Sequence, residues 1–433
     1  MALFYNISMA AVIKNVFRAK NINLKLIMSH ARTFCDAPKF PGAKTSWTEK
    51  LEISHAKPQD NLPVYRVLDR EGNVIDSSHE PKLSEEVLKK MYRSMTLLSI
   101  MDNILYESQR QGRISFYMTN LGEEAAQIGS IAAMRDDDMV FGQYREAGVL
   151  VYRGMALDVF MNQCYGNNKD LGKGKQMPVH YGNKDLNFVT ISSPLTTQLP
   201  QAVGAAYAFK RIKNNERAVI TYFGDGAASE GDFHAALNFA ATLECPILFF
   251  CRNNGYAIST PTYEQYRGDG IASRGPGYGI GAVRCDGNDV LAVYNTVQLA
   301  RKYITEHCKP ILVEAMTYRV GHHSTSDDST AYRPKEEIGM WSTTENPIGK
   351  FKKYLVTRGL WSDQEEQQWT KEARTQILQS FNKAEKVPKP DWREMFEGVY
   401  ESLTPDLKSQ IEEMESHLKV YGANYPLESF KSS

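Results

Sequence analysis

Apolar and polar positions follow different periods along the chain, and these periods predict the elements of its middle region. Three continuous apolar runs have the length and composition of buried strands: "AVITYF" (218–223), "PILFFCR" (246–252) and "PILVEAMTYRV" (310–320). Between the first two lies "GDFHAALNFAATLE" (231–244), which has a helical pattern with many small residues. Continuous apolar strands separated by helices are typical of a parallel sheet covered by helices on both faces, so the sequence predicts an α/β fold.

Other patterns flank this region on both sides. Residues 36–62 are rich in Pro, Lys and Asp and indicate an extended arm, and a helix is predicted from about Ser84, a plausible N-cap, to Arg110. From about Asn346 the chain becomes charged and helical. The predicted organisation is a leader, an arm with the first helix, an α/β domain and a helical C-terminal region, over residues 1–40, 41–95, 96–345 and 346–433.

The N-terminal segment carries charge of one sign only. No acidic residue precedes Asp36, whereas five basic residues do. Between Ala11 and Met28 apolar residues recur at helical spacing, with Lys14 and Arg18 one turn apart. A basic, acid-free, amphipathic leader is typical of a mitochondrial transit peptide, which predicts a protein of the mitochondrial matrix. A disordered basic tail is the alternative.

The composition argues against two classes of protein. The chain has 51 basic and 51 acidic residues, a balance that does not favour a nucleic-acid-binding surface. No apolar run approaches the roughly 18 residues that a membrane-spanning helix needs. The six cysteines show no Cys-x-x-Cys pair and no framework spacing, as expected for reduced thiols in a matrix protein.

Candidate chemistry lies where the first two predicted strands end. Two parallel strands joined by one helix form a right-handed crossover and end on the same edge of the sheet, where open α/β sheets bind ligands. Asp225 follows the first strand and Asn254 follows the second, so a carboxylate and an amide carbonyl should lie close together. Such hard oxygen ligands suit magnesium bound to phosphate groups. Gly224 and Gly226 would let the backbone approach a diphosphate closely.

Several motifs together resemble one family of subunits. "GDGAASEGD" followed by "NN" is similar to the thiamine-diphosphate fingerprint. The motifs "QYREAGVL", "GKGKQMPVHYG", "ISSPLTTQLPQAVGAAYA", "CRNNGYAISTPT" and "YRVGHHSTSDDS" resemble the α subunits of the branched-chain 2-oxoacid dehydrogenase decarboxylating component, over roughly residues 38–430. The resemblance implies a thiamine-diphosphate-binding fold and oxidative decarboxylation of branched-chain 2-oxoacids. The α subunit of a pyruvate-specific or a broad 2-oxoacid dehydrogenase is the alternative.

The resemblance also implies roles for individual residues. The cofactor's magnesium would be held by Asp225, Asn254 and the carbonyl oxygen of Tyr256. The diphosphate end of the cofactor would be contacted by Tyr144, Arg145, Ser193, Gly226, Ala227, Arg252 and His323. His323 would also be catalytic, since it can reach the reacting substrate. A potassium ion would be held by Ser192, Pro194, Thr197 and Gln198, although a helix start rich in Ser and Thr gives the same string. Asp225 stands where some relatives carry Glu.

The stretch "GHHSTSDDSTAYR" (321–333) is polar and has no hydrophobic period, which predicts a loop at the same edge of the sheet. Its Ser324 matches the position that kinase-regulated relatives phosphorylate. A phosphate there would add negative charge beside Asp327, Asp328 and a bound diphosphate, which should repel and disorder the loop. The relatives' second phosphoserine is replaced here by Pro334.

The resemblance implies partner proteins as well. In this family a Glu of a β subunit lies beside the aminopyrimidine ring of the cofactor, and the sequence contains no second α/β half that could supply it. The expected assembly is an α2β2 heterotetramer that works with a lipoyl-bearing acyltransferase core and with a regulatory kinase and phosphatase. The C-terminal aromatics Tyr421 and Tyr425 are candidates for the subunit interface, and an ordinary hydrophobic tail is the alternative.

Overall fold

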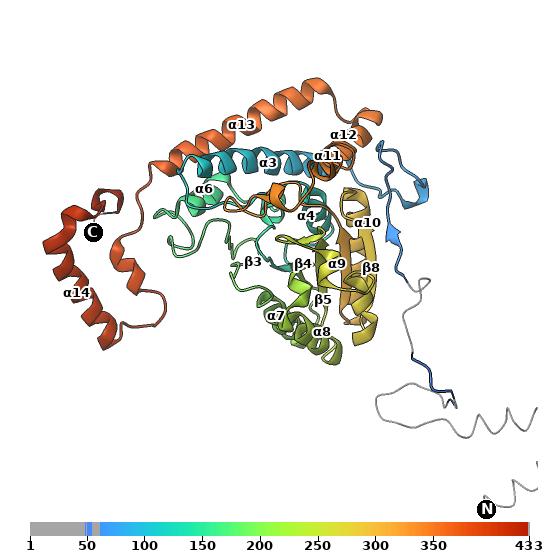
Figure 1. The fold of residues 1–433 in the computed structure, drawn as a ribbon, viewed down its shortest axis with the longest axis horizontal. Helices are drawn as coiled ribbons and strands as arrows, with labels where there is room; N and C mark the ends of the chain where they lie inside the picture. Colours follow the sequence, from blue (N-terminus) through green and yellow to red (C-terminus); the bar gives the residue numbers. More distant parts are fainter. Residues whose placement is uncertain (1–47, 49, 54–60, 432–433) are drawn as a thin grey trace, which may run out of the picture. The chain divides into compact units, whose positions relative to one another are not determined.

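The centre of the protein is a parallel sheet (Figure 1). The computed structural model describes residue 48, residues 50–53 and residues 61–431, so the predicted transit peptide lies outside the described part of the chain. Seven strands pair in the order β1-β8-β9-β5-β4-β2-β3, all neighbours parallel. Their bounds are Val64–Tyr65 (β1), Met139–Phe141 (β2), Phe188–Val189 (β3), Val219–Gly224 (β4), Ile247–Asn253 (β5), Gly281–Asp286 (β8) and Ile311–Met316 (β9). A separate antiparallel pair joins β6 (Tyr256–Ala257) to β7 (Thr260–Pro261).

Helices cover both faces of this sheet. Successive side chains of a strand point to opposite faces, and in β4 the side chains of Ile220 and Tyr222 join one buried apolar cluster whereas Val219 and Phe223 join another. The first cluster contains side chains of α3 (Glu85–Arg110), α4 (Glu124–Ala132), α5 (Ala147–Tyr152), α6 (Leu157–Tyr165) and α10 (Val290–His307). The second contains side chains of α7 (Gln198–Arg211) and α8 (Gly231–Thr242). The predicted α/β fold with a doubly covered parallel sheet is confirmed.

The predicted first helix is present as α3. Ser84 is its N-cap, and the Ser84 hydroxyl accepts a hydrogen bond from the Val87 N–H at 3.4 Å. The helix runs unbroken to Arg110, so the boundary predicted between residues 95 and 96 falls inside it. None of the helices in residues 61–431 is both long and apolar enough to cross a bilayer.

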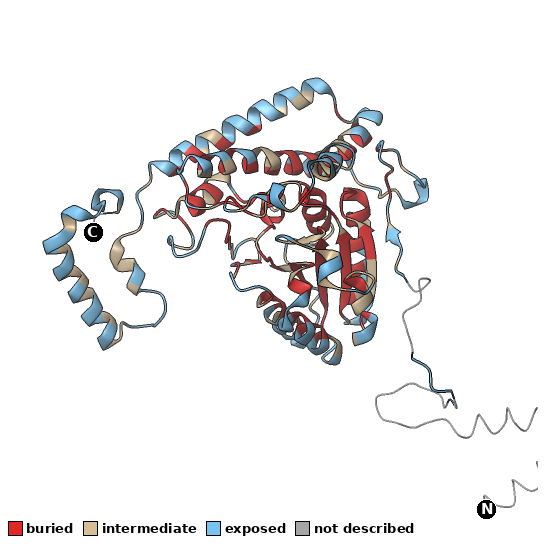
Figure 2. Cartoon of the chain, viewed as in Figure 1, coloured by how far each residue is buried: buried red, intermediate tan, exposed pale blue. Residues whose placement is uncertain are grey.

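Charged helices follow the sheet: α11 (Lys335–Thr343), α12 (Pro347–Thr357), α13 (Asp363–Glu385) and α14 (Pro405–Tyr421). Helix α13 packs on α3 and α6 and buries Ile377 and Phe381, whereas α14 has no buried residue (Figure 2). The remaining elements are α9 (Thr262–Gln265) and the 3-10 helices Ser77–His79, Ala227–Ser229, Ala272–Arg274, Pro276–Tyr278, Ser329–Ala331, Trp392–Phe396, Gly422–Asn424 and Leu427–Ser429.

The third predicted strand is shorter than expected, and the strands β1, β2, β3 and β8 of the sheet were not predicted. The run 310–320 forms β9 only as far as Met316. Thr317 N–H still donates to the Asn253 carbonyl of β5, but farther on the backbone bonds elsewhere, since Val320 N–H donates to the Leu121 carbonyl. At the edge of the sheet, the short β1 pairs with β8 through Val64 and Arg284. The next residues of the chain, Val67 and Leu68, donate their N–H groups to the Asp289 carboxylate at 2.7 and 2.6 Å.

Candidate functional site

A cavity of about 350 Å³ opens at the carboxyl ends of β4 and β5. The register of these strands pairs Gly224 with Arg252, which brings the segments that follow them side by side. The lining of the cavity includes most of the site residues named from the sequence, namely Tyr144, Arg145, Asp225, Gly226, Ala227, Arg252, Asn254, Tyr256 and His323. The predicted site residues thus come from four separate segments of the chain and line one cavity.

The three predicted magnesium ligands lie together on this lining. Gly255 has a φ of +86°, a conformation that favours glycine, and it turns the chain so that Asn254 Oδ1 accepts from the Tyr256 N–H at 3.2 Å. Asp225 is buried, and Gln265 Nε2 donates to its carboxylate at 2.8 Å. Burial raises the pKa of Asp225, so a cation beside it would stabilise the charged form.

The chemistry of these donors fits magnesium. A carboxylate, an amide carbonyl and a backbone carbonyl are all hard oxygen ligands, and magnesium takes its other ligands from phosphate groups and water. No cluster of three or more His, Cys, Asp and Glu side chains suited to a metal occurs among the residues that the structure describes.

Buried positive charge also lines this cavity. The side chain of Arg145 donates to the carbonyls of Thr119 and His323, and that of Arg319 to the Ile258 carbonyl and the Tyr332 hydroxyl. Within residues 61–431 no ion pair joins either guanidinium to a carboxylate, and the buried Arg319 Nε has no hydrogen-bond partner. Buried guanidinium groups that form no direct ion pair are costly, so an anion such as a diphosphate fits beside them.

His323 is held between these two arginines. Its Nδ1 lies 3.3 Å from a guanidinium nitrogen of Arg145 and 3.3 Å from one of Arg319. Burial and the two positive charges lower the pKa of His323 to about 3. A guanidinium can only donate, so Nδ1 accepts and the proton of the neutral ring lies on Nε2. His323 can therefore donate one hydrogen bond from Nε2 without carrying charge.

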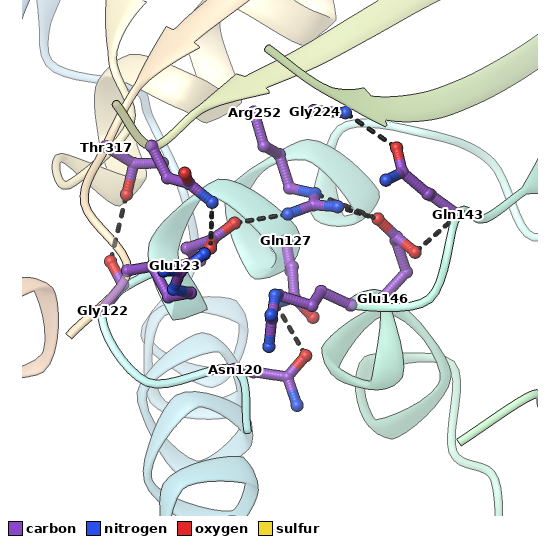
Figure 3. A network of polar contacts seen from close by, with 12 residues as sticks. Asn120, Gly122, Glu123, Gln127, Gln143, Glu146, Gly224, Arg252 and Thr317 are labelled. Atoms are coloured by element: carbon purple, nitrogen blue, oxygen red, sulfur yellow. Dashed lines mark hydrogen bonds and ion pairs between the residues drawn. The ribbon is translucent and has the colours of Figure 1, made fainter. Parts of the chain in front are cut away.

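Arg252 differs from the other two arginines because two buried carboxylates neutralise it (Figure 3). Its guanidinium pairs with Glu146 at 2.6 Å and also with Glu123. Glu146 Oε2 accepts from the N–H groups of Gln143 and Tyr144 at 2.8 Å each, and Gln143 Oε1 accepts from the Gly224 N–H at 2.8 Å. The network ties the segment that carries Tyr144 and Arg145 to the end of β4.

Glu123 links this network to the predicted metal ligands. Its Oε1 accepts from Asn254 Nδ2 at 2.9 Å, while its Oε2 accepts from Arg252. Burial raises the pKa of Glu123, but the charges of Arg252 and Arg145 and the Asn254 hydrogen bond lower it by more, so the net pKa lies below the ordinary value. Glu123 is therefore ionised, and a carboxylate in that state only accepts hydrogen bonds.

Ser193 and the predicted potassium ligands lie beside the cavity, outside its lining. Thr197 Oγ1 lies 3.1 Å from the Pro194 carbonyl oxygen and 3.4 Å from Ser192 Oγ. Gln198 Nε2 donates to the Tyr222 carbonyl at 3.0 Å, so its amide nitrogen is already engaged. Leu195, in the middle of this segment, does line the cavity.

Ser193 instead pairs with the buried His180. The Ser193 hydroxyl lies 2.9 Å from His180 Nε2, and His180 Nδ1 lies 3.1 Å from the Pro178 carbonyl oxygen. His180 is buried, and both of its ring nitrogens have partners. His180 therefore has the contacts of a satisfied core histidine.

The predicted loop 321–333 is folded against the site. Ser324 is buried, and its Oγ accepts from the Ser326 N–H at 3.2 Å. Asp327 Oδ2 accepts from the His323 N–H at 2.7 Å and from the Tyr332 hydroxyl at 2.6 Å. Any enzyme that modifies Ser324 must therefore first displace the loop.

Sequence reasoning missed several of the groups that support the site. Glu123, Gln143, Glu146 and Gln265 all contact a predicted ligand or its segment. The two glutamates had a usable signal: each stands in a run of small and apolar residues, "LGEEAAQIGS" and "YREAGVLV", where a buried acid needs a buried partner. Gln143 and Gln265 had no such signal.

Comparison with known proteins gives one consistent group of relatives. The family model of the dehydrogenase E1 component matches residues 92–393. The chain is 58% identical over 395 residues (91% of this chain, 88% of the relative) to the human 2-oxoisovalerate dehydrogenase subunit alpha, mitochondrial. It is 58% identical over 384 residues (89% of each chain) to the Caenorhabditis elegans protein of that name. It is 50% identical over 392 residues (90% and 83%) to the Arabidopsis thaliana subunit alpha 2, mitochondrial.

Proposed function

The chain belongs to the dehydrogenase E1 component family, and from this premise we propose that it is the α subunit of an α2β2 enzyme of branched-chain amino-acid catabolism. The enzyme decarboxylates branched-chain 2-oxoacids oxidatively with thiamine diphosphate and passes the acyl group to the lipoyl group of an acyltransferase core. The names of the relatives, 2-oxoisovalerate dehydrogenase subunit alpha from animals and a plant, support this function over a pyruvate-specific or broad enzyme. Their names also carry the word mitochondrial, which supports a matrix location.

The observation that carries the proposal is the pairing of a magnesium ligand set with buried positive charge in one cavity. Asp225, Asn254 and the Tyr256 carbonyl would hold magnesium, while Arg145 and Arg319 would bind the diphosphate. Bound thiamine diphosphate supplies the electron sink for loss of carbon dioxide. His323 would donate from Nε2 to the diphosphate or the substrate carboxylate. The remaining predicted diphosphate contacts are Tyr144, Ser193, Gly226, Ala227 and Arg252.

A potassium ion would stiffen the wall of this cavity. The Ser192 hydroxyl and the Pro194 carbonyl oxygen lie within 3.4 Å of the Thr197 hydroxyl, and the side-chain carbonyl of Gln198 stays free of the bond that its amide nitrogen makes to Tyr222. Hydroxyl and carbonyl oxygens are suitable ligands for a cation of low charge density. Since Leu195 of the same segment lines the cavity, an ion held there would fix the position of that wall.

The function requires partners. One parallel sheet is present in residues 61–431, and the acid beside the aminopyrimidine ring would come from a β subunit. Tyr421 and Tyr425 are 51% and 46% exposed at the C-terminus and are candidate contacts for it. A kinase and a phosphatase would act on Ser324, whose place next to His323 would let a phosphate repel the cofactor's diphosphate.

The test is reconstitution with a β subunit and measurement of carbon dioxide release from 3-methyl-2-oxobutanoate and from pyruvate. We expect magnesium- and thiamine-diphosphate-dependent turnover that is faster with the branched-chain substrate. The chain alone should be inactive, and a tetramer with Asn254→Leu should lose turnover because the magnesium loses an oxygen ligand. Faster turnover of pyruvate would favour the alternative enzyme, and turnover by the chain alone would contradict the α2β2 proposal.

A further inference from the structure

Each of the two asparagines that follow "CR" at the end of β5 has its amide held by a buried glutamate. Asn253 Nδ2 donates to Glu314 Oε1 at 2.8 Å, and Asn254 Nδ2 donates to Glu123 Oε1 at 2.9 Å. Both glutamates are fully buried. A carboxylate only accepts hydrogen bonds, so each glutamate fixes which end of its asparagine's amide is the nitrogen.

For Asn254 this choice determines what faces a metal ion. With Nδ2 bound to Glu123, the Oδ1 atom accepts, among the described residues, only from the Tyr256 N–H, at 3.2 Å, and keeps capacity for a cation. A half-turn of the amide would present hydrogens to the cation instead. The oxygen and nitrogen of an amide are nearly equal in size, so packing alone does not select one orientation.

Glu123 is itself placed rigidly enough to impose this orientation. Its second oxygen pairs with Arg252, and the residue before it, Gly122, has a φ of +93°. A Cβ on Gly122 would lie 2.2 Å from the Tyr318 carbonyl oxygen, so the backbone is in close contact there. The Thr317 hydroxyl donates to the Gly122 carbonyl at 3.0 Å (Figure 3).

We propose that Glu123 is a positioning residue that orients the Asn254 amide so that its oxygen faces the magnesium ion of the cofactor. The inference rests on the function proposed above. Partners of metal ligands commonly change metal affinity by 10–100-fold when they are replaced. In Glu123→Gln the amide nitrogen of the new side chain opposes either Asn254 Nδ2 or Arg252, both of which are donors, so one of the two contacts is lost.

The experiment measures cofactor binding rather than turnover. The chain is reconstituted with its β subunit, and thiamine diphosphate binding is followed by tryptophan fluorescence while magnesium chloride is titrated. We expect Glu123→Gln to raise the magnesium concentration at half-saturation by about 10–100-fold. The control is Glu314→Gln, which changes an equally buried carboxylate bound to the neighbouring asparagine. It should lower the melting temperature but leave magnesium half-saturation within threefold of the parent.

A reciprocal exchange of the two side chains distinguishes a change in the orientation of the Asn254 amide from loss of the Glu123 charge. Asn254→Asp alone places two carboxylates against each other, and adding Glu123→Gln restores a donor and an acceptor with the roles reversed. The double variant should bind magnesium at least tenfold more tightly than Asn254→Asp alone. This comparison also tests the proposed role of Glu123 if the single Glu123→Gln variant does not assemble.

Two results overturn the inference. One is a Glu123→Gln tetramer whose magnesium half-saturation matches that of Glu314→Gln, since Glu123 would then serve stability only. The other is a double variant that binds no better than Asn254→Asp. Failure of the proposed function is distinct, because the unaltered tetramer would then show no magnesium-dependent binding of thiamine diphosphate.

Discussion

Gly226 offers a quantitative test of how closely the backbone must approach the cofactor. Its backbone is helical (φ −62°, ψ −40°), so alanine introduces no conformational strain there. A Cβ at this position would lie 2.6 Å from Ala257 Cβ and 3.2 Å from Ala257 Cα. Two methyl groups in contact need almost 4 Å, so Gly226→Ala must displace strand β6 by about 1 Å.

The displacement reaches the proposed magnesium ligands directly, because Ala257 follows Tyr256 in β6. Overpacking of a close contact costs about 1–3 kcal/mol. If that cost falls on the cofactor-bound state, the dissociation constant of thiamine diphosphate rises by roughly 5- to 150-fold. The dissociation constant can be measured by titrating thiamine diphosphate into the reconstituted tetramer at saturating magnesium.

A compensating substitution tests whether the contact with Ala257 causes the loss of cofactor affinity. Adding Ala257→Gly to Gly226→Ala removes the methyl group that the new Cβ meets and should recover most of the affinity. Gly339→Ala is the matched control, since a Cβ at that exposed helical position meets nothing within 4 Å. The reasoning is refuted if Gly226→Ala binds cofactor as tightly as the parent, or if the double variant binds no better than the single one.

Three other predictions concern charge in and around the site. Arg252→Met leaves two buried carboxylates without a counter-charge and should destabilise the fold by about 3–5 kcal/mol in thermal unfolding. Arg70→Met removes an exposed arginine whose partner Glu345 still pairs with Lys350, so it should change the melting temperature little. Ser324→Glu should abolish turnover with a lipoyl acceptor while magnesium still binds, and full activity in that variant would end the idea of a phosphorylation switch. Because the pKa of His323 is lowered to about 3, its contribution to stability is present above pH 6.5 and is lost as the pH falls. At pH 5 the loss is about 2 kcal/mol, so His323→Gln should flatten the fall in melting temperature between pH 7 and 5 in cofactor-free protein; an unchanged slope would contradict the buried neutral imidazole.

The parts of the fold that could be predicted from sequence are those with local signals. The central strands β4, β5 and β9 are continuous apolar runs, and α3 begins at a capping serine. Asp225 and Asn254 could be identified from the sequence for the same reason, since each comes directly after the last residue of a strand. Parallel pairing then requires them to meet at one edge of the sheet.

The supporting residues could not be predicted because their partners are far away in the sequence. Glu123 and Glu146 pair with Arg252 from 129 and 106 positions away, and no local period reports such a contact. Ser193 stays a prediction: the motif implies a cofactor contact, and in the structure its hydroxyl is engaged by His180 beside the cavity. Motifs indicate which residues gather, and tertiary packing decides which side chains face the ligand.

The edge strand β1 has a consequence for how the chain acquires its fold. Residues 64–68 find their partners, Arg284 and Asp289, only about 220 positions later. Closing a loop of that length costs roughly 5 kcal/mol of chain entropy beyond a constant term, so this pairing forms late. Until it forms, β8 is an open edge with unpaired backbone groups, a template for association with other chains. The first strand of the described residues is thus among the late elements to be secured, and a truncation that removes residues 61–68 should aggregate during refolding.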